Sequence, residues 1–404
     1  MTHSGESNVK LNTIHAVEEA ERIYDQLVAW RRDFHQHPEM GLETYRTAGL
    51  VASTLRELGY TVQEGVAQSG VVGLLENGEG PVIMNRVDMD ALPIQEENPA
   101  DYASEVPECM HACGHDAHTA IGLGVAKIMA EGRENWSGTL KLIFQPGEEG
   151  ENGAEIMVQE GVLENPRPLV ILATHIWNHM PFGKVAAAPG PVMAAAEAFR
   201  VVFHGKGGHG ALPEKSIDPV VTAAMAIMNL QTIVSRNISA LETAVISIGA
   251  LHAGDAFNVI PETAELRGTI RTYDTGVRER VLKRMVTVIE GTAEMMGATA
   301  ELELMPLTPA LVNDRSVTSL VQEVVVDLLG EDALEIGERT MGSEDAAFFL
   351  QEVPGCYFFV ASGPEDYQDR PHHSSRFDIE ERALVNGVAV VVESLLRLMP
   401  YRGD

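Results

Sequence analysis

The chain has 404 residues, of which 45% are hydrophobic, so it is long enough to bury a core and to form two domains. Its 59 acidic and 29 basic residues give a formal net charge of −30, which argues against nucleic acid or an anionic membrane as a partner. No stretch reaches the ~18 uncharged apolar residues of a membrane span, and the polar N-terminus lacks the apolar core of a signal peptide. With three cysteines and no disulfide framework, we expect a cytoplasmic globular protein.

Short apolar runs alternate with helical patterns in the first half of the chain. A helix is predicted over residues 13–37, and strand-like runs rich in Val, Ile or Leu follow at 80–90, 139–150 and 168–177. Between the first two runs, residues 118–132 carry apolar side chains at helical spacing. This alternation predicts an α/β domain with a central, mostly parallel sheet that is covered by helices.

The rhythm changes over residues 193–306. The pattern there is strand, helix, strand, strand, helix, strand, which is the ferredoxin-like βαββαβ order. Helical patterns at 317–330 and 381–399 then restore the α/β character. We therefore expect a catalytic domain built from residues 1–192 and 307–404, interrupted by an inserted domain.

Charged and imidazole side chains follow the apolar runs of the first half. Asp88 and Asp90 end the first run, Glu148 and Glu149 the second, and His175 the third. In open parallel sheets, ligands bind beyond the carboxyl ends of the strands. These five residues are therefore expected at one edge of the sheet, where a functional site would form.

The stretch "MHACGHDAHTA" places Cys113 and His115 two positions apart. In an extended segment such residues project to the same side, so one thiolate and one imidazole can meet the same ion. Zinc sites usually need three or four ligands. From these residues alone, a metal site, a structural role and a cysteine nucleophile all remain possible.

The stretch "FQPGEEG" puts two adjacent carboxylates, Glu148 and Glu149, in a Pro/Gly-framed loop. Neighbouring residues point in different directions, so one can bind metal while the other faces a bound water. A carboxylate beside metal-bound water is what amide hydrolysis needs. A solvated loop is the plainer alternative, because exposed Glu pairs are common.

Further histidines are candidates for the same site. A lone histidine in an apolar run is more often a core residue, but the place of His175 at the same sheet edge favours a ligand. One of His372 and His373 can complete the site, and the other is expected at the surface. His35 and His37 end a helix before a proline turn and are interpreted as structural.

Nine ordered motifs give the chain a family resemblance over about residues 25–400. It resembles the aminoacylase and carboxypeptidase family of dinuclear metallohydrolases, and most closely the branch of hippurate hydrolase, the auxin-conjugate amidohydrolases and N-acetyldiaminopimelate deacetylase. The motifs are "HQHPEMGLE", "RVDMDALPIQE", "HACGHDAHTA", "FQPGEEG", "THIW", "GKGGHGALPEKSIDPV", "NVIPETAELRGTIRT", "GSEDAAFF" and "HHSSRFD".

The resemblance implies two divalent metal ions in each subunit. Zinc is the first expectation, with manganese, cobalt or nickel as alternatives, since mixed N/O/S sites accept all four. Cys113 is the implied bridging ligand. The ligands that the resemblance implies are Cys113, His115, Glu149, His175 and His373.

The resemblance also implies an activity, the hydrolysis of the amide bond of N-acyl amino acids. Glu148 matches the general base, and Asp88 matches an aspartate that orients a ligand or tunes the site. Arg86 stands where the wider family has a ligand histidine, a departure that the cysteine-containing branch shares. A dipeptidase or carboxypeptidase using the same site is the main alternative. A thiol hydrolase using Cys113 and His115, and a metal-dependent binding protein, are two others.

The inserted domain resembles the family's lid and dimerisation domain. His209 matches a histidine that reaches the partner subunit's active site and stabilises the oxyanion. Asn258 and Arg271 match residues that hold the substrate's carboxylate, for which arginine offers a planar fork. The resemblance therefore implies a homodimer acting on a small N-acyl amino acid or peptide.

Overall fold

The computed structural model describes residues 15–400 and divides into two compact units. The first contains the residues up to Gly190, then Asn313–Glu338, and the residues from Phe348 onward. The second contains Pro191–Val312 and also Arg339–Ala347. This last segment, which the sequence pattern assigned to the catalytic domain, pairs with the start of the second unit, where the Ala194 N–H donates to the Gly342 carbonyl at 2.8 Å.

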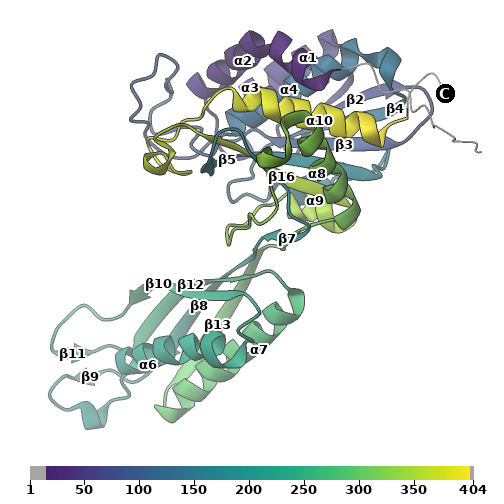
Figure 1. The fold of residues 1–404 in the computed structure, drawn as a ribbon. Coiled ribbons are helices and arrows are strands. Elements are labelled where there is room, and N and C mark those ends of the chain that lie inside the picture. Colours follow the sequence, from purple (N-terminus) through teal and green to yellow (C-terminus); the bar gives the residue numbers. More distant parts are fainter. Residues whose placement is uncertain (1–14, 401–404) are drawn as a thin grey trace, which may run out of the picture. The chain divides into compact units, whose positions relative to one another are not determined.

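An eight-stranded sheet forms the centre of the first unit, in the order β1-β2-β4-β3-β5-β16-β6-β15 (Figure 1). The central pairs β4-β3, β3-β5 and β5-β16 are parallel, whereas β1 and β2 add an antiparallel edge. The mostly parallel α/β sheet predicted from the sequence is thus confirmed. The strands are β1 (Thr61–Val66), β2 (Gly70–Asn77), β3 (Val82–Asp88), β4 (Gly138–Gln145), β5 (Val170–Pro181), β6 (Val185–Ala186), β15 (Leu334–Glu335) and β16 (Gly355–Gly363).

Helices cover this sheet because their apolar faces need a partner. Helix α4 is buried along nearly its whole length and contacts β3, β4 and β5, while α2 and α10 pack against α4. No helix in the span 15–400 is long and apolar enough to cross a membrane. The helices of this unit are α1 (Ala16–Arg22), α2 (Tyr24–Gln36), α3 (Tyr45–Glu57), α4 (His115–Glu131), α5 (Gly153–Gln159), α8 (Arg315–Leu329), α9 (Ala347–Glu352) and α10 (Ala383–Leu398).

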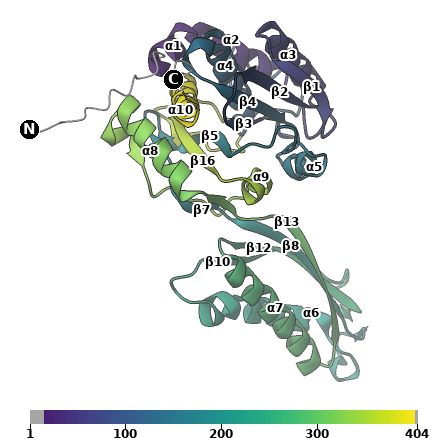
Figure 2. The same cartoon turned by 90° about the vertical axis from the view of Figure 1, so that its right-hand side faces the viewer.

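The second unit is a four-stranded antiparallel sheet with two helices, α6 and α7, that pack against each other (Figure 2). Its strand order β10-β12-β8-β13 and chain order β8-α6-β10-β12-α7-β13 are those of a ferredoxin-like βαββαβ fold. The elements are β8 (Ala195–His204), α6 (Pro219–Thr232), β10 (Ala244–His252), β12 (Thr263–Thr272), α7 (Thr275–Met295) and β13 (Thr299–Thr308), with the short pairs β9 (Gly208–His209) with β11 (Val259–Ile260) and β7 (Gly190–Met193) with β14 (Leu311–Asn313).

Candidate metal centre

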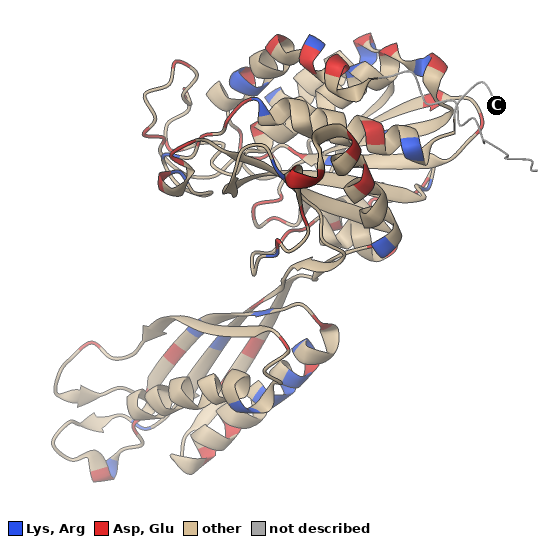
Figure 3. Ribbon diagram, in the orientation of Figure 1, with Lys and Arg blue, Asp and Glu red and all other residues tan. Residues whose placement is uncertain are grey.

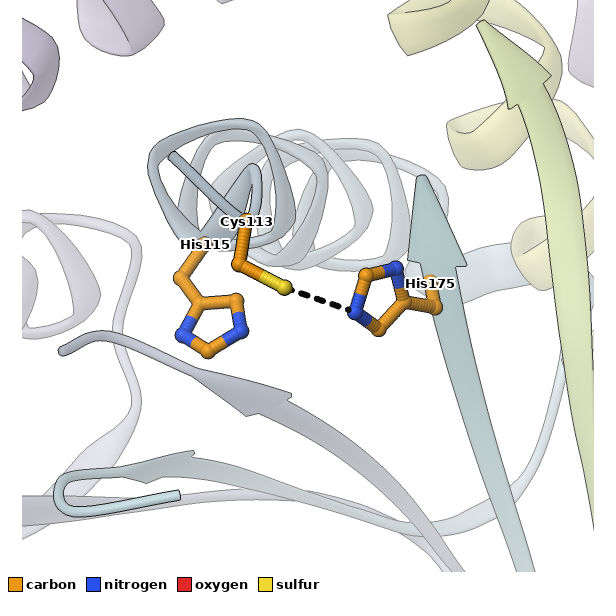
Figure 4. A group of neighbouring side chains, drawn as sticks. All are labelled: Cys113, His115 and His175. Carbon is orange, nitrogen blue, oxygen red and sulfur yellow. Dashed lines mark hydrogen bonds between the residues drawn. The ribbon is translucent and has the colours of Figure 1, made fainter. Parts of the chain in front are cut away.

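Two groups of possible metal ligands share one sulfur atom in the first unit. Ligand atoms of Cys113, His115 and His175 all lie within 4.8 Å of one another (Figure 4), and the same holds for Cys113, Glu149 and His373. These five side chains come from the segment that leads into α4 and its first residue, the middle of β5, the turn after β4 and the loop before α10. Cys113 belongs to both groups, as a ligand that bridges two metal ions would.

Gly114 explains how Cys113 and His115 reach the same place. It has φ +91° and is the residue before the first turn of α4, a left-handed conformation that glycine adopts without steric cost. A Cβ at this position would also contact Ile176 and Phe377 at 3.4 Å. The two ligands therefore converge across a glycine turn, and not along the extended segment expected from the sequence.

The His175 ring is held by the backbone beside it. Its Nδ1 lies 2.5 Å from the carbonyl oxygen of Ile176, and its Nε2 lies 3.5 Å from the sulfur of Cys113. Because a carbonyl can only accept, Nδ1 carries the proton and Nε2 presents its lone pair to the cluster. This is the tautomer that a metal ligand needs.

The two histidines of the C-terminal loop have different surroundings. His373 has φ +61°, its backbone N–H donates to the Ala112 carbonyl at 2.8 Å, and its Nε2 lies 3.2 Å from Glu149 Oε1. The motif left open which of the two lies at the surface, and the resemblance implied His373 as the ligand. His372 is half-buried: its Nε2 accepts from the Asn178 N–H at 3.0 Å and its Nδ1 lies 3.9 Å from the sulfur of Cys113. The His373 side chain is the more exposed of the two, at 53%.

Asp88 is completely buried at the end of β3 and is shared by three side chains. Its carboxylate contacts His118 Nδ1 at 2.5 Å and Arg86 Nη1 at 2.7 Å, and lies 3.9 Å from His115 Nε2. Burial alone would raise the pKa of Asp88, but His115, His118 and Arg86 hold it well below its usual value. His118 in turn accepts from the Ile176 N–H at 2.8 Å, so Asp88 braces the sheet edge that carries the ligands.

The electrostatics of the cluster fit a divalent cation. Burial by itself would lower the pKa of His115, but the carboxylates of Asp88, Asp90 and Glu149 raise it to about 10. Both ring nitrogens of His115 are buried, and they lie 3.9 Å and 3.5 Å from the carboxylates of Asp88 and Asp90. Several buried carboxylates beside imidazole nitrogens and a thiol form the kind of environment whose negative charge a bound metal ion neutralises.

The same charges argue against a cysteine nucleophile. Burial, together with the carboxylates of Glu149 and Glu148, raises the pKa of Cys113 well above its usual value. A thiol nucleophile needs the opposite, a pKa lowered by neighbouring positive charge. Of the alternatives left open by the sequence for Cys113, metal ligation therefore fits best.

Two further buried aspartates, Asp116 and Asp90, lie beside the candidate cluster. Asp116 accepts from Arg31 Nε at 2.9 Å and from His35 Nδ1 at 2.8 Å, contacts that are consistent with the structural interpretation of His35. Asp90, which received no role, accepts from the backbone N–H groups of Glu148 and Glu149. Only the fold brings these partners together, since they lie up to 85 positions apart.

The remaining predicted residues lie in the second unit and do not form one cluster there. The strand pair β9–β11 joins His209 to Val259, and the carbonyl of Asn258 accepts from the Gly210 N–H at 2.8 Å. Arg271 lies near the other end of β12, where its Nη1 donates to Ser343 Oγ at 2.8 Å. Eight residues of strand separate Thr263 from Arg271, a distance of roughly 26 Å at the usual rise.

The chain is similar to known proteins over most of its length. Residues 84–397 match the model of peptidase family M20/M25/M40. The chain is 38% identical to the IAA-amino acid hydrolase ILR1-like 4 of Arabidopsis thaliana, covering 91% of this chain and 84% of that protein. It is 37% identical to thermostable carboxypeptidase 2 of Saccharolobus solfataricus (91% and 94% covered) and 36% identical to the N-acetyl-L-cysteine deacetylase of Bacillus subtilis (93% and 88% covered).

A solved structure gives the same result in three dimensions. The Bacillus subtilis YXEP protein, described as a dinuclear metal-binding peptidase of the M20 family, superimposes with a TM-score of 0.83 at 31% sequence identity. The match covers 94% of this chain and 99% of that one. Both units are therefore included in the similarity.

Proposed function

Because the chain belongs to peptidase family M20/M25/M40, we propose that it is a metal-dependent amidohydrolase that cleaves the amide bond of N-acyl amino acids. The observation that carries the proposal is the shared position of Cys113 in two ligand groups, with the carboxylates of Glu148 and Glu149 beside His115. Relatives named for the hydrolysis of IAA-amino acids and of N-acetyl-L-cysteine support this substrate class.

Two divalent ions complete the proposed site. Zinc is our first candidate, and manganese, cobalt and nickel are the alternatives, because a set of one thiolate, three imidazoles and one carboxylate suits all of them. When bound, the ions polarise the substrate carbonyl and lower the pKa of water. Elemental analysis of the purified protein, and activity after reconstitution with each metal, test the identity and the number. The proposed ligands are Cys113, His115, Glu149, His175 and His373.

Glu148 is the proposed general base. It takes a proton from the attacking water and returns it to the leaving amine, while Asp88 braces the ligands from behind. The Glu148→Ala variant should lose about 10²–10⁴-fold or more in kcat, the usual contribution of a general base, and should retain its metal. Glu151→Ala, in the same loop but exposed, is the matched control. A Glu148→Ala protein without metal would show that Glu148 is a ligand instead.

A dipeptidase or carboxypeptidase activity is the second candidate, supported by the similarity to a thermostable carboxypeptidase. The same site would act on a peptide bond in place of a simple acyl amide. A panel of hippurate-like amides, N-acetyl amino acids and dipeptides, compared by kcat/KM, separates the two. Bound metal without hydrolysis of any member would favour a binding protein.

Arg271, Asn258 and His209 are the proposed contacts for the substrate's carboxylate and for the oxyanion. Arg271 is about half-buried, and desolvation lowers its pKa from the usual value. A bound carboxylate would offset that desolvation of the guanidinium. Arg271 lies roughly 26 Å along β12 from Thr263, whereas His209 and Asn258 lie at the β9–β11 pair that precedes Thr263, so we infer that one copy of this unit does not bring all three residues to one substrate. Arg271 from one subunit, with Asn258 and His209 from its partner, is the arrangement that we propose.

A homodimer follows from that arrangement, and the second unit has a surface that suits it. Helix α6 contains no Asp, Glu, Lys or Arg (Figure 3). Its residues Val221 and Met228, seven positions apart on one face, are 46% and 69% exposed. Strand β10 lies at the edge of the sheet and carries no Asp, Glu, Lys or Arg, although free edges are usually protected by charge. Two copies can cover both features at once.

Light scattering tests the dimer directly. Met228→Asp should produce a monomer that still binds metal but has lost activity, because each site would lack the partner's residues. Val286→Asp, at an exposed position of α7, is the matched control and should stay dimeric. A Met228→Asp protein that remains dimeric would show that the interface lies elsewhere.

All three cysteines are unpaired, which supports the cytoplasm as the proposed location.

A further inference from the structure

Asp90 is a buried carboxylate, 1% exposed, and both of its oxygens accept hydrogen bonds from one turn. Oδ1 accepts from the Glu148 N–H and Oδ2 from the Glu149 N–H, each at 3.0 Å. Two successive backbone N–H groups held by the two oxygens of one carboxylate fix the orientation of the peptide unit between them. The direction in which each glutamate side chain leaves the turn is fixed at the same time.

The turn itself is built around two glycines. Gly147 and Gly150 enclose the two glutamates with φ +70° and φ +94°, and glycine visits such conformations and others at little cost. Within the turn, the Gly150 N–H donates to the Glu148 carbonyl at 2.7 Å and the Gly153 N–H to the Gly147 carbonyl at 3.0 Å. Asp90 adds an anchor from outside the turn, and it is the one that holds the N–H groups of both glutamates.

The same carboxylate also touches the first turn of α4. Asp90 Oδ1 lies 3.5 Å from Nδ1 of His115. Asp90 thus contacts the proposed base Glu148 and the proposed ligand Glu149 on one turn, and the proposed ligand His115 at the start of α4.

We propose that Asp90 is a positioning residue, which fixes the positions of the base Glu148 and the ligand Glu149 relative to His115. It acts through these three residues and does not touch the substrate. The inference rests on the proposed function, since it assigns Glu148 as the base. It adds that the separation of base and ligand is controlled from the end of β3 and not by the glutamate turn itself.

The Asp90→Asn and Asp90→Ala variants test this inference. Asparagine keeps one acceptor oxygen, so one of the two N–H groups should lose its partner, whereas alanine should release both. Hydrogen exchange in the chelated enzyme should then accelerate at the Glu148 and Glu149 amides, at one of them in Asp90→Asn and at both in Asp90→Ala. Amides of β4, such as those of Leu142 and Phe144, report whether the sheet stays folded.

Kinetics give the second readout. Supporting residues of metal sites typically change activity or metal affinity about 10–100-fold, so kcat should fall by that factor at saturating metal while KM stays within a few-fold. Asp101→Asn, exposed in the loop after β3, is the matched control. Unchanged exchange at both amides, or full kcat in Asp90→Ala, would overturn the inference. If the wild-type enzyme hydrolyses no amide in the panel, the proposed function fails, while the exchange test of the Asp90 anchor still stands.

Discussion

Arg31 offers a sharp test of how the fold supports the candidate site. Its side chain is completely buried and pairs with Asp116 at 2.9 Å, Asp378 at 3.0 Å and Glu381 at 3.3 Å. Arg31→Met would keep most of the packing and leave a buried carboxylate, Asp116, without its main counter-charge. Removing one partner of a buried ion pair costs about 3–5 kcal/mol, and we expect a loss of unfolding free energy in that range.

Tryptophan fluorescence in urea measures the effect in the correct unit, because Trp30, Trp136 and Trp177, the three tryptophans of the chain, all lie in the first one. Arg32→Met is the control. The Arg32 side chain is 43% exposed and pairs with Glu381 at 2.7 Å, a partly exposed contact of the kind that is usually worth less than ~1 kcal/mol.

The pH dependence of the Arg31→Met loss is a second and independent outcome. In the wild type, burial would raise the pKa of Asp116, but Arg31 and His35 hold it well below its usual value. A carboxyl with a lowered folded-state pKa stabilises the protein above its unfolded pKa, and this stability is lost only as pH falls through the folded value. Between pH 5 and 8, Asp116 therefore adds no slope in the wild type.

In Arg31→Met the burial effect has less opposition, so the pKa of Asp116 should rise above the unfolded value. A group of that kind stabilises the protein at low pH and loses this contribution as pH rises. The stability difference between Arg31→Met and wild type should therefore grow from pH 5 to pH 8. A difference that is below ~1 kcal/mol, as for an exposed pair, or that shrinks as pH rises, would refute the argument.

Three further outcomes concern the metal centre. Gly114→Ala should cost roughly 1–2 kcal/mol, the penalty for an L-residue in a left-handed conformation, and should weaken metal binding, which titration calorimetry measures; unchanged affinity would contradict the role given to the glycine turn. Metal binding at neutral pH should release protons, because the pKa values of His115 and Cys113 are raised in the metal-free site; calorimetry in buffers of different ionisation enthalpy counts them, and apparent affinity should rise with pH. Chelation should lower the thermal midpoint, and metal at about 100 times its Kd should restore about 2.7 kcal/mol; a midpoint indifferent to metal would count against a site in the folded protein.

Local sequence patterns determined much of the fold. Apolar runs of period two or of continuous character located β3, β4 and β5, and helical periodicity located α4, α8 and α10, because burial imposes these patterns on any chain. The antiparallel strands β1 and β2 were not predicted. Their sequences, "TVQEGV" and "GVVGLLEN", are short and mix charge or glycine with apolar residues, so their place in the sheet depends on pairing with β4.

The sequence by itself also brought the ligand candidates to one edge of the sheet, since the parallel strands that carry Asp88, Glu148 and His175 must end on the same side. The motif residues alone left His372 and His373 open, and the resemblance implied His373; that the His372 ring also lies 3.9 Å from the Cys113 sulfur could not be read from the sequence. Nor could the sequence reveal the anchor of Asp90 on a turn 58 positions away or the burial of Arg31 between α4 and the loop before α10. Such contacts join segments distant in the chain, and only the packing of helices onto the sheet sets their distances and removes the water that would otherwise screen their charges.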